Sequence, residues 1–464
     1  MNFQIYDIAI IGAGPGGYEA AVRASQLGLS VAIIEKEALG GTCLNRGCIP
    51  TKTLLKSANV LRTLQDANRF GIIVTPPQVD FAKVMARSRE VVATLRNGID
   101  FLLKKHNVTQ IFGTGTLVSP TSLRVQKADG ATESVEAKHI IIATGARPRN
   151  IPAFPIDEER IISSNRALNL NELPASMLII GSGAIGCEMA YFYACMGVAV
   201  TLVETLPNIA PYCDAEVSRQ LDRSLHKMGI ATLTSAQVLK VERCGTGCCT
   251  HLTSKKGEEI ITTDLVLSAV GIQANVENIG LEAIGVTVEK GKIKVDGNYC
   301  TNVPSVFAVG DVIATPALAH VATAEALRCV ERIAGLAAPD ICYDAVPACI
   351  YTSSEVGWAG LTEAEATQRG ISVAIGKSSY LSSGKANADG ARDGFVKLIF
   401  DATTLQLLGA HCIGEHVTEM LGELTLAITS HTTAPQLAGH IHAHPTMYEA
   451  VGNAAFQVSA TSGC

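Results

Sequence analysis

Cys43 and Cys48 enclose four residues, LNRG, within the stretch GGTCLNRGCIP, which otherwise has the composition of a glycine-rich turn. Such a pair can serve as metal ligands, as unreactive buried thiols, or as a redox-active disulfide. Metal sites more often use CxxC pairs that combine with a second Cys or His cluster, and no such cluster stands out in the sequence. We therefore expect no metal at this pair, which leaves the redox and the buried alternatives.

The segment after the pair favours the redox alternative. Pro50 stands where the first turn of a helix would begin, and KTLLKSANVLRTL continues with helical periodicity. Cys48 would then lie at a helix N-terminus, where the helix dipole lowers the pKa of a thiol. Lys52 follows one turn later and adds positive charge.

A candidate acid-base pair lies near the C-terminus, where HAHPT contains His442 and His444. A loop histidine before proline is often only solvated or a helix cap. Disulfide exchange, however, needs a base that generates the attacking thiolate, and imidazole has a suitable pKa. Glu449 follows His444 by five residues and could hold the other ring nitrogen, as carboxylates do in catalytic triads.

These groups need elements that position them, and the first such element is a nucleotide-binding motif. The apolar run 6–11 is followed by Gly12, Gly14 and Gly17 in a GxGxxG pattern, and then by a helical pattern. The next strand, SVAIIE, ends on Glu35, 23 residues after Gly12. A strand, tight turn and helix of this kind offer backbone N–H groups to a pyrophosphate, and the acid can accept a ribose hydroxyl.

The same motif recurs. Gly181, Gly183 and Gly186 follow the run SMLII, and Glu204 ends the next strand 23 residues after Gly181. The acid at Glu204, with no arginine beside it to take a 2'-phosphate, favours NAD over NADP. Two dinucleotide motifs in one chain indicate a flavin facing a nicotinamide, between which hydride passes readily.

The composition fits a cytoplasmic protein that acts on small molecules or proteins. A chain of 464 residues, 47% hydrophobic, is too long for one domain. Its net charge of -6 provides no basic face for nucleic acid, and no apolar run approaches the roughly 18 residues of a membrane-spanning helix. The 14 cysteines are irregularly spaced, so we expect most of them to be buried reduced thiols.

Several motifs together resemble the flavin-dependent pyridine nucleotide-disulfide oxidoreductases. They are GGTCLNRGCIPTK, ATGARP at 143–148, FAVGD at 307–311, LAHVATAE at 318–325 and HPTMYE at 444–449, with both glycine motifs between them in the family's order. The resemblance covers essentially the whole chain. It implies an α/β fold with two Rossmann-like dinucleotide-binding domains, for FAD and NAD, and a C-terminal α+β dimerisation domain.

The resemblance also implies roles for individual residues. Cys48 would be the thiolate that touches the flavin and Cys43 the sulfur that exchanges with substrate, while His444 would be the base and Glu449 its partner. His442 is expected to be structural. The cofactor-binding residues implied are Gly12, Gly14, Gly17 and Glu35 for the ADP part of FAD, Asp311 for its ribityl chain, Gly181, Gly183, Gly186 and Glu204 for NAD, Lys52 and Glu188 as an ion pair near the reactive flavin nitrogen, and in addition Thr144, Gly145, Gly271, Ala319 and His320.

Within that family the tail IHAHPTMYEA is most like enzymes that oxidise dihydrolipoamide to lipoamide and reduce NAD to NADH. The implied partners are lipoylated carrier proteins of 2-oxoacid dehydrogenase or glycine-cleavage complexes, and the implied assembly is a homodimer. Alternatives are a glutathione- or mercuric-reductase-like enzyme, or a subunit that mainly binds lipoyl carriers. Glu204 opposes the NADPH preference of a glutathione reductase, and the tail ATSGC offers only Cys464 for a second redox pair.

We expect four segments: an FAD-binding domain at 1–148, an NAD-binding domain at 149–276, a central segment at 277–342 that completes the FAD domain, and a dimerisation domain at 343–464. Ser354, Ala326 and Gly384 lie where the sequence departs from the family's usual pattern, and we expect these positions to face the interface or the carrier. CGTGCC at 244–249 could be a second redox or metal-binding element through its adjacent Cys248 and Cys249. A surface hairpin with incidental thiols is the expected structure there.

Overall fold

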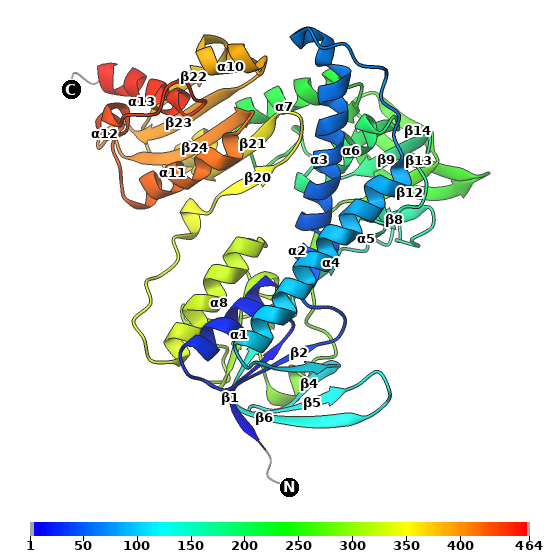
Figure 1. Cartoon of the computed structure of the whole chain (residues 1–464), viewed down its shortest axis with the longest axis vertical. Helices are drawn as coiled ribbons and strands as arrows, with labels where there is room; N and C mark the ends of the chain where they lie inside the picture. Colours follow the sequence, from blue (N-terminus) through cyan, green and yellow to red (C-terminus); the bar gives the residue numbers. More distant parts are fainter. Residues whose placement is uncertain (1–3, 462–464) are drawn as a thin grey trace. The chain divides into compact units, whose positions relative to one another are not determined.

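The computed structural model describes residues 4–461 (Figure 1); Cys464 lies outside the described residues. The chain divides into two compact units. Unit 1 comprises Met1–Thr53, Met85–Arg149 and Ile272–Tyr343, and unit 2 comprises Leu54–Val84, Asn150–Gly271 and Asp344–Cys464. Residues 54–84 thus belong to unit 2, whereas the sequence assigned them to the FAD domain. The division into four segments stays a prediction.

Unit 1 is built on a seven-stranded sheet of order β3-β2-β1-β6-β5-β4, with β19 paired to β6. Its strands are β1 (Ile5–Ile11), β2 (Val31–Glu35), β3 (Thr109–Phe112), β4 (Thr114–Ser119), β5 (Ser122–Gln126), β6 (Thr132–Ile142) and β19 (Val306–Ala308). Strands β1, β2, β3, β6 and β19 pair in parallel, and β4, β5 and β6 pair antiparallel. The parallel strands carry almost continuous apolar runs because both faces of such a sheet are covered.

Helices of unit 1 join these strands. They are α1 (Pro15–Gln26), α2 (Gly41–Arg46), α3 (Cys48–Gln65), α4 (Phe81–Lys105) and α8 (Ala319–Ile333), of which α3 and α4 continue into unit 2. Helix α1 crosses from β1 to β2, packs beside α8, and buries its small residues in the core. The predicted strand, turn and helix around the first glycine motif is confirmed.

The NAD part predicted from the sequence folds in unit 2 as a second parallel sheet, of order β11-β10-β9-β15-β8. Its strands are β8 (Ile161–Ser163), β9 (Ser176–Ile180), β10 (Ala199–Val203), β11 (Ala231–Leu233) and β15 (Leu265–Ser268), joined by helices α5 (Ser164–Ala167), α6 (Ala184–Cys195) and α7 (Ala215–Lys227). An antiparallel sheet follows, made of β12 (Gln237–Cys244), β13 (Gly247–Ser254) and β14 (Gly257–Thr263).

The C-terminal part of unit 2 is an antiparallel sheet of order β20-β21-β24-β23-β22. Its strands are β20 (Ala348–Ile350), β21 (Glu355–Gly360), β22 (Val373–Ser379), β23 (Phe395–Asp401) and β24 (Leu407–Gly414), and its helices are α9 (Glu363–Gln368), α10 (Gly384–Asp389), α11 (Val417–Thr429), α12 (Ala434–Gly439) and α13 (Glu449–Thr461). Helices α11 and α13 pack on the sheet (Figure 1). The α/β fold with a C-terminal α+β domain is therefore confirmed.

Short elements complete the chain. They are the strand pairs β7 (Ala146–Pro148) with β16 (Ile272–Ala274) and β17 (Val288–Glu289) with β18 (Lys292–Ile293), and the 3-10 turns η1 (Ala67–Phe70), η2 (Glu282–Ile284), η3 (Gly310–Val312), η4 (Tyr343–Ala345) and η5 (Tyr380–Ser382). Over residues 4–461, none of the helices combines the length and the apolar character that crossing a bilayer requires.

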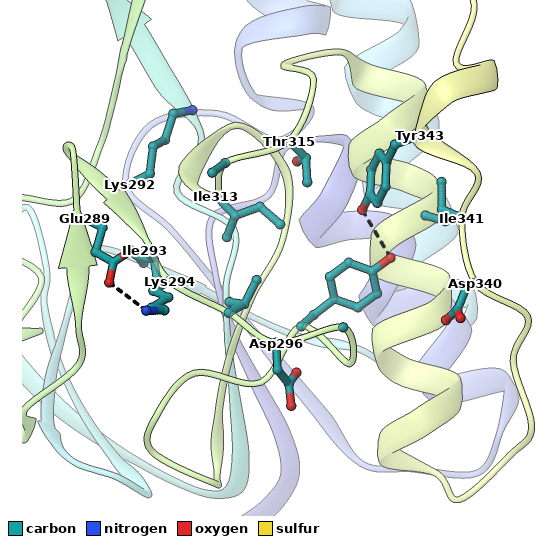
Figure 2. A pocket seen from close by; sticks show the side chains of 14 residues that line it. Glu289, Lys292, Ile293, Lys294, Asp296, Ile313, Thr315, Asp340, Ile341 and Tyr343 are labelled. Carbon is teal, nitrogen blue, oxygen red and sulfur yellow. Dashed lines mark hydrogen bonds and ion pairs between the residues drawn. The ribbon is translucent and has the colours of Figure 1, made fainter. Parts of the chain in front are cut away.

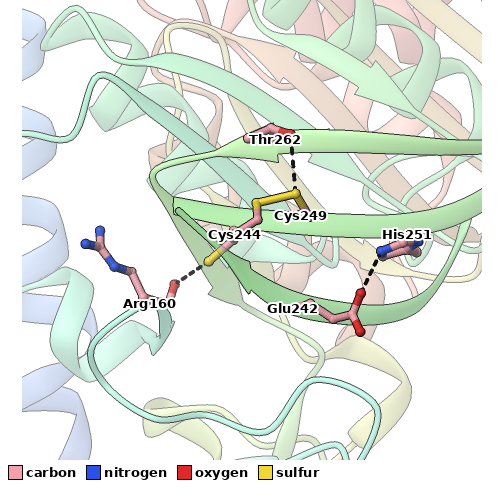
Figure 3. The surroundings of a disulfide bond; sticks show 7 residues. Arg160, Glu242, Cys244, Cys249, His251 and Thr262 are labelled. Atoms are coloured by element: carbon pink, nitrogen blue, oxygen red, sulfur yellow. Dashed lines mark hydrogen bonds and ion pairs between the residues drawn. A yellow bond between two sulfur atoms is a disulfide. The ribbon is translucent and has the colours of Figure 1, made fainter. Parts of the chain in front are cut away.

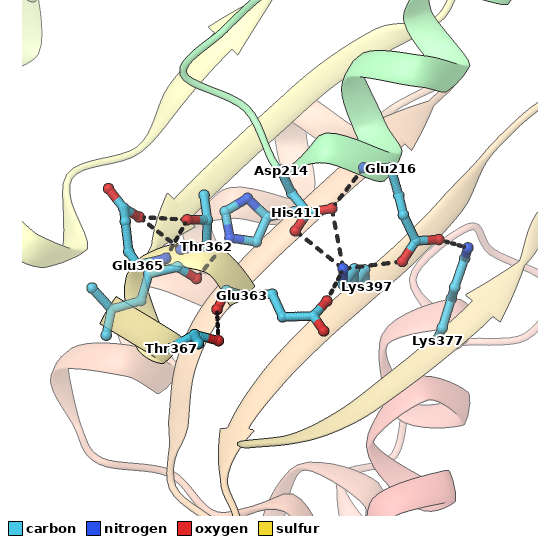
Figure 4. A network of polar contacts seen from close by, with 10 residues as sticks. Asp214, Glu216, Thr362, Glu363, Glu365, Thr367, Lys377, Lys397 and His411 are labelled. Atoms are coloured by element: carbon cyan, nitrogen blue, oxygen red, sulfur yellow. Dashed lines mark hydrogen bonds and ion pairs between the residues drawn. The ribbon is translucent and has the colours of Figure 1, made fainter. Parts of the chain in front are cut away.

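A buried ionic network joins helix α7 to the C-terminal sheet (Figure 4). The side chain of Lys397 on β23 is 1% exposed, and its Nζ lies 3.1 Å from both carboxylate oxygens of Asp214. Glu216 and Glu363 lie 3.0 and 2.8 Å from the same nitrogen. Burying a lysine is costly unless partners replace its water, and here carboxylates of Asp214, Glu216 and Glu363 do so, which ties the start of α7 and α9 to this sheet.

Candidate functional site

The first glycine motif forms a tight loop between β1 and α1. Gly12 has a φ of +101°, and a Cβ there would lie 2.4 Å from the carbonyl oxygen of Ala143. A Cβ on Gly17 would lie 1.9 Å from the carbonyl oxygen of Gly12, so both positions exclude a side chain. Glu35 accepts hydrogen bonds from the backbone N–H groups of Ala13 and Glu37, each at 2.8 Å. The acid therefore anchors the glycine loop as well as ending β2.

The second glycine motif repeats this construction between β9 and α6. Gly181 has a φ of +98°, and a Cβ on Gly186 would lie 1.9 Å from the Gly181 carbonyl oxygen. Glu204 accepts from the backbone N–H of Ser182 at 3.0 Å and from the Ser182 hydroxyl at 2.7 Å. Burial raises the pKa of Glu204, but hydrogen bonds from Leu206 and Ser182 outweigh it and hold the pKa below its usual value.

Gly183 differs from its neighbours in the second loop. A Cβ at this position would meet no atom within 4 Å, and its φ is -66°, which any residue can adopt. The protein itself therefore does not require glycine here. A dinucleotide whose pyrophosphate approaches the N-terminus of α6 would require it, because a side chain would stand in its path.

The residues predicted around the flavin lie at the edge of the unit 1 sheet. Thr144 follows β6 and donates its hydroxyl to the carbonyl oxygen of Asn275 at 2.7 Å, while Gly145 has a φ of +66°. Asp311 lies in η3, directly after β19, where burial raises the pKa of its carboxyl group and the charge of Lys292 opposes that shift. Parallel strands bring these corners together because their carboxyl ends share one edge of the sheet.

Two residues near Asp311 were not identified as site residues from the sequence. Glu325 on α8 is fully buried and accepts hydrogen bonds from the Gly310 backbone N–H at 2.7 Å and from the Tyr343 hydroxyl at 2.8 Å. It thus fixes the turn that presents Asp311. The sequence offered one signal for Glu325, an acid on the apolar face of a helix. It offered no signal for the contact with Tyr343, which lies 18 residues later in the chain.

A cavity of about 480 Å³ opens beside this turn (Figure 2). Lys292, Ile313, Thr315, Tyr299 and Tyr343 contribute to its wall, and the two tyrosine hydroxyls lie 3.3 Å apart. None of the residues predicted from the sequence lines it.

The cysteine pair lies where helices α2 and α3 meet. Cys48 is the first residue of α3, as predicted, but Cys43 lies on the short helix α2 rather than in an open turn. A hydrogen bond with Cys48, together with burial and the charge of Cys48, raises the pKa of Cys43 well above its ordinary value, against the smaller effect of Lys52. The two sulfurs are therefore neighbours, with both cysteines in the thiol form.

His444 and Glu449 are also brought together. The Nδ1 atom of His444 lies 2.8 Å from Oε1 of Glu449, which begins helix α13, and Oε2 accepts the backbone N–H of Thr446 at 3.1 Å. The hydrogen bond with His444 holds the pKa of Glu449 below its usual value. The His444 side chain is 77% exposed, so Nε2 is available to a substrate. The five-residue spacing thus predicted this contact correctly.

The remaining predicted site residues lie at ends of elements. Ala319 and His320 begin α8, and Gly271 follows β15 with a φ of +101°. Glu188 on α6 is almost fully buried and accepts the backbone N–H of Tyr351 at 3.1 Å. Lys52 and Glu188 belong to different units, as do the cysteine pair and His444, so their pairing and their catalytic roles stay predictions.

Two of the departures from the family pattern do not face an interface, contrary to the prediction. Ala326 is fully buried in the unit 1 core beside α1. Ser354 is also buried, and its hydroxyl lies 3.3 Å from that of Ser224 on α7. Gly384, which begins α10, has no atom within 4 Å of an added Cβ.

The CGTGCC segment forms the turn between β12 and β13, as the hairpin prediction required, but its thiols are not incidental (Figure 3). Cys244 and Cys249 form a disulfide, with Cα atoms 5.7 Å apart. The adjacent Cys248 points to the other face of β13, is buried, and lies 3.6 Å from the Arg160 carbonyl oxygen. Successive residues of a strand face opposite sides, so Cys249 pairs across the hairpin and not with its neighbour.

Comparisons with known proteins agree with this geometry. The family profile "Pyridine nucleotide-disulphide oxidoreductase" matches residues 6–326, and the dimerisation-domain profile of that family matches residues 346–455. The chain is 42% identical over 459 residues to the dihydrolipoyl dehydrogenase of Chlorobaculum tepidum, covering 99% of this chain and 98% of the relative. It is 44% identical over 470 residues to the dihydrolipoyl dehydrogenase of Rhizobium etli, covering 97% of each. The crystal structure of LpdA from Mycobacterium tuberculosis matches with a TM-score of 0.90 at 26% identity, covering 97% of this chain and 99% of that one.

Proposed function

Because the chain belongs to the pyridine nucleotide-disulphide oxidoreductase family, we propose that it oxidises dihydrolipoamide to lipoamide and reduces NAD to NADH. The observation that carries this proposal is the contact between Cys43 and Cys48 at the N-terminus of α3, in the unit that holds the first glycine loop. The names of the relatives from Chlorobaculum tepidum and Rhizobium etli support the choice of substrate.

The two glycine loops fit FAD in unit 1 and NAD in unit 2. Each loop excludes side chains at its first and last glycine and presents a helix N-terminus to a pyrophosphate. Glu204 supports NAD over NADP, because a second negative charge on a 2'-phosphate would meet a carboxylate whose pKa lies below its usual value. When bound, the flavin and the nicotinamide supply the two-electron transfer that leads from the enzyme dithiol to NADH.

The protein's own residues carry the thiol–disulfide exchange. His444, held through Nδ1 by Glu449, takes the proton of one substrate thiol at Nε2. The resulting thiolate attacks Cys43 of the Cys43–Cys48 disulfide, a mixed disulfide forms, and Cys48 leaves as a thiolate. The second substrate thiol then attacks the substrate sulfur of the mixed disulfide, its proton passes to the departing Cys43, and the lipoamide ring closes. The substrate thus loses two electrons and two protons: the electrons reduce the Cys43–Cys48 disulfide, one proton is held by His444 and the other by Cys43.

We further propose a homodimer in which His444 serves the cysteine pair of the other subunit. The dimerisation profile covers residues 346–455, and this region exposes Leu426, Ile441 and the nearby Phe456, by 65%, 91% and 63%. Large apolar groups gathered into one exposed patch mark an interface, and the proposed dimer would cover these three. Lipoylated carrier proteins of 2-oxoacid dehydrogenase or glycine-cleavage complexes are the proposed partners.

Turnover with dihydrolipoamide and NAD, compared with glutathione disulfide and NADPH, tests the reaction. The first pair should be turned over and the second should not. His444→Gln should lower turnover by about 10²- to 10⁴-fold, the usual range for a general base. His416→Gln, at an exposed histidine in the turn before α11, is the matched control and should leave turnover unchanged. Near wild-type turnover of His444→Gln would remove this histidine from the mechanism.

Mixing two inactive variants tests the dimer. If His444 acts across the interface, hybrids of Cys43→Ser and His444→Gln chains contain one intact site each. Random mixing should then restore roughly a quarter of wild-type turnover, since half of the dimers are hybrids with one working site of two. No recovery in a mixture shown to exchange subunits would place the histidine and the cysteines of each site in the same chain.

A further inference from the structure

Three side chains near the proposed base form a cluster that the reaction does not use. They are Glu423 on α11, His440 at the C-terminal end of α12, and His442 two residues later. One potential ligand atom of each lies within 4.8 Å of those of the other two. Nε2 of His442 lies 2.9 Å from Oε1 of Glu423, and the two imidazole rings are 5.0 Å apart and perpendicular.

The backbone places the two imidazoles on the same side of the chain. His440 ends α12 in an extended conformation, with φ of -71° and ψ of 134°. The rings of His440 and His442 lie 5.0 Å apart, and Ile441 between them in sequence is 91% exposed. A Cβ on Gly452 would lie 3.1 Å from Nδ1 of His442, so a glycine on α13 makes room for this ring.

We propose that Glu423, His440 and His442 bind one divalent transition-metal ion of the Zn²⁺ class. Two imidazoles and one carboxylate form a donor set that zinc accepts, with water in the remaining position. Ligand bonds of about 2.0–2.2 Å place tetrahedral donors about 3.3 Å apart, so atoms that now lie within 4.8 Å need to move by only about 1 Å.

The position of His440 separates this proposal from an ordinary hydrogen-bonded pair. The bond between Nε2 of His442 and Oε1 of Glu423 pairs these two atoms and would need no third residue. The imidazole of His440 beside that pair adds a third ligand atom, and its lone pair can face an ion held between the three side chains. The side chain of His442 is only 7% exposed, so the ion would be held partly inside the protein, against α11 and α13.

Metal binding here has a consequence that rests on the proposed function. His444 lies two residues after His442 on the same segment. An ion that fixes His440 and His442 to Glu423 would restrain the segment that presents His444, and would therefore lower turnover with dihydrolipoamide. The binding itself does not depend on the reaction.

Binding is tested on the flavin-loaded, oxidised enzyme after removal of metals with a chelator and alkylation of accessible thiols. Equilibrium dialysis with Zn²⁺ should show one ion per chain, and Co²⁺ should give the weak visible bands of nitrogen and oxygen ligands without intense thiolate charge-transfer absorption. His440→Asn should weaken Zn²⁺ binding at least tenfold, whereas His416→Asn should not. Because His440 is exposed, its replacement should leave the fold intact.

Unchanged affinity in His440→Asn, or a thiolate band in the Co²⁺ spectrum, would overturn the site. The inhibition arm compares turnover with and without Zn²⁺ in each protein, and His440→Asn should lose most of the inhibition seen in the wild type. Binding of one Zn²⁺ per chain without inhibition would support the metal site but would contradict the proposed restraint of His444. Failure of the proposed reaction would appear separately, as absent turnover in the metal-free enzyme.

Discussion

Lys397 allows the energetic role of one buried charge to be measured. Burial lowers the pKa of its ammonium group, but hydrogen bonds with Glu363, Glu216 and Asp214 outweigh it and raise the pKa to about 12. Lys397→Met keeps much of the side-chain volume and removes the charge. Of the three partner carboxylates, Asp214 would be destabilised most by this change, because its side chain is only 4% exposed.

The three carboxylates differ in what they lose. Glu363 is half-exposed and can return to water, and Glu216 keeps its ion pair with Lys377. One buried carboxylate is thus left without its counter-ion, and breaking a buried pair in this way costs about 3–5 kcal/mol. We expect the free energy of unfolding to fall by that amount.

Lys377→Met is the matched control. Its side chain is 40% exposed, so loss of its ion pair with Glu216 should cost about 1 kcal/mol or less. Its ammonium also lies 4.3 Å from the centre of the Phe395 ring, a contact that adds about 0.5–1 kcal/mol. The control should therefore be clearly less destabilised than Lys397→Met.

The assay uses the single tryptophan of the chain, Trp358. It lies on β21 opposite His411 of β24, and His411 lies opposite Lys397, so its fluorescence reports on this sheet. Denaturant titration at pH 7 and fixed protein concentration gives the free energies. Adding Asp214→Asn to Lys397→Met should recover at least half of the loss, since Asn can still cap α7 as Asp214 does through the Glu216 N–H.

The pH dependence has a defined sign. A raised pKa in the folded state stabilises the protein below the ordinary lysine pKa of 10.5, and this stabilisation is lost as the pH rises through about 12. The difference between wild type and Lys397→Met should therefore stay constant from about pH 7 to 9. If the free energy of unfolding of Lys397→Met at pH 7 lay within about 1 kcal/mol of the wild-type value, the reasoning would be refuted, because Asp214 would not depend on this ammonium group.

Three further predictions concern the glycine loop, the histidine pair and the hairpin disulfide. Gly186→Ala should destabilise unit 2, because its Cβ would stand 1.9 Å from a backbone carbonyl oxygen, whereas Gly183→Ala should fold normally and weaken NADH binding at least tenfold. Thermal melts and NADH titration separate the two effects, and tight NADH binding by Gly183→Ala would contradict the loop assignment. Glu449→Gln should lower kcat by about 10- to 100-fold through loss of the His444 contact. The pKa of Glu449 is below its usual value, so its carboxylate should stay charged above about pH 5. The ratio of wild-type to variant kcat should therefore stay constant from about pH 5 to 8, and a ratio that falls to one within this range would count against this role. Alkylation of the denatured, unreduced protein should modify Cys248 but neither Cys244 nor Cys249, and peptide mass mapping that finds all three modified would exclude the hairpin disulfide.

Local features were well predicted because their causes are local. The glycines at positions 12 and 181 are required by a left-handed backbone that only glycine adopts readily. Glu35 ends its strand and Glu204 directly follows its strand, and both strands are of predictable length. The start of α3 at Cys48 followed from Pro50, and the contact between His444 and Glu449 from a spacing of five residues. The sequence did not reveal that both acids bind the glycine loop itself.

Groups that meet only through tertiary packing were missed. Glu423 and His442 are 19 residues apart, and Lys397 meets Asp214 across 183 residues, so no pattern within one segment indicates either contact. Ala326 and Ser354 were expected at a surface and are buried, because a small residue in a helix or loop carries no signal about what packs against it. The disulfide between Cys244 and Cys249 depends on strand register, which sets the side each thiol faces.

The amino-acid sequence alone therefore determined the family resemblance, the two glycine loops and the cysteine pair at the start of α3, since short segments with their own backbone requirements encode each of them. Tertiary structure decided which charges are buried together, which thiols pair on the hairpin, and that His440 and His442 share a face with Glu423. These outcomes depend on how separate elements pack, because a side chain's neighbours across a sheet or between helices are set by register and burial rather than by distance along the chain.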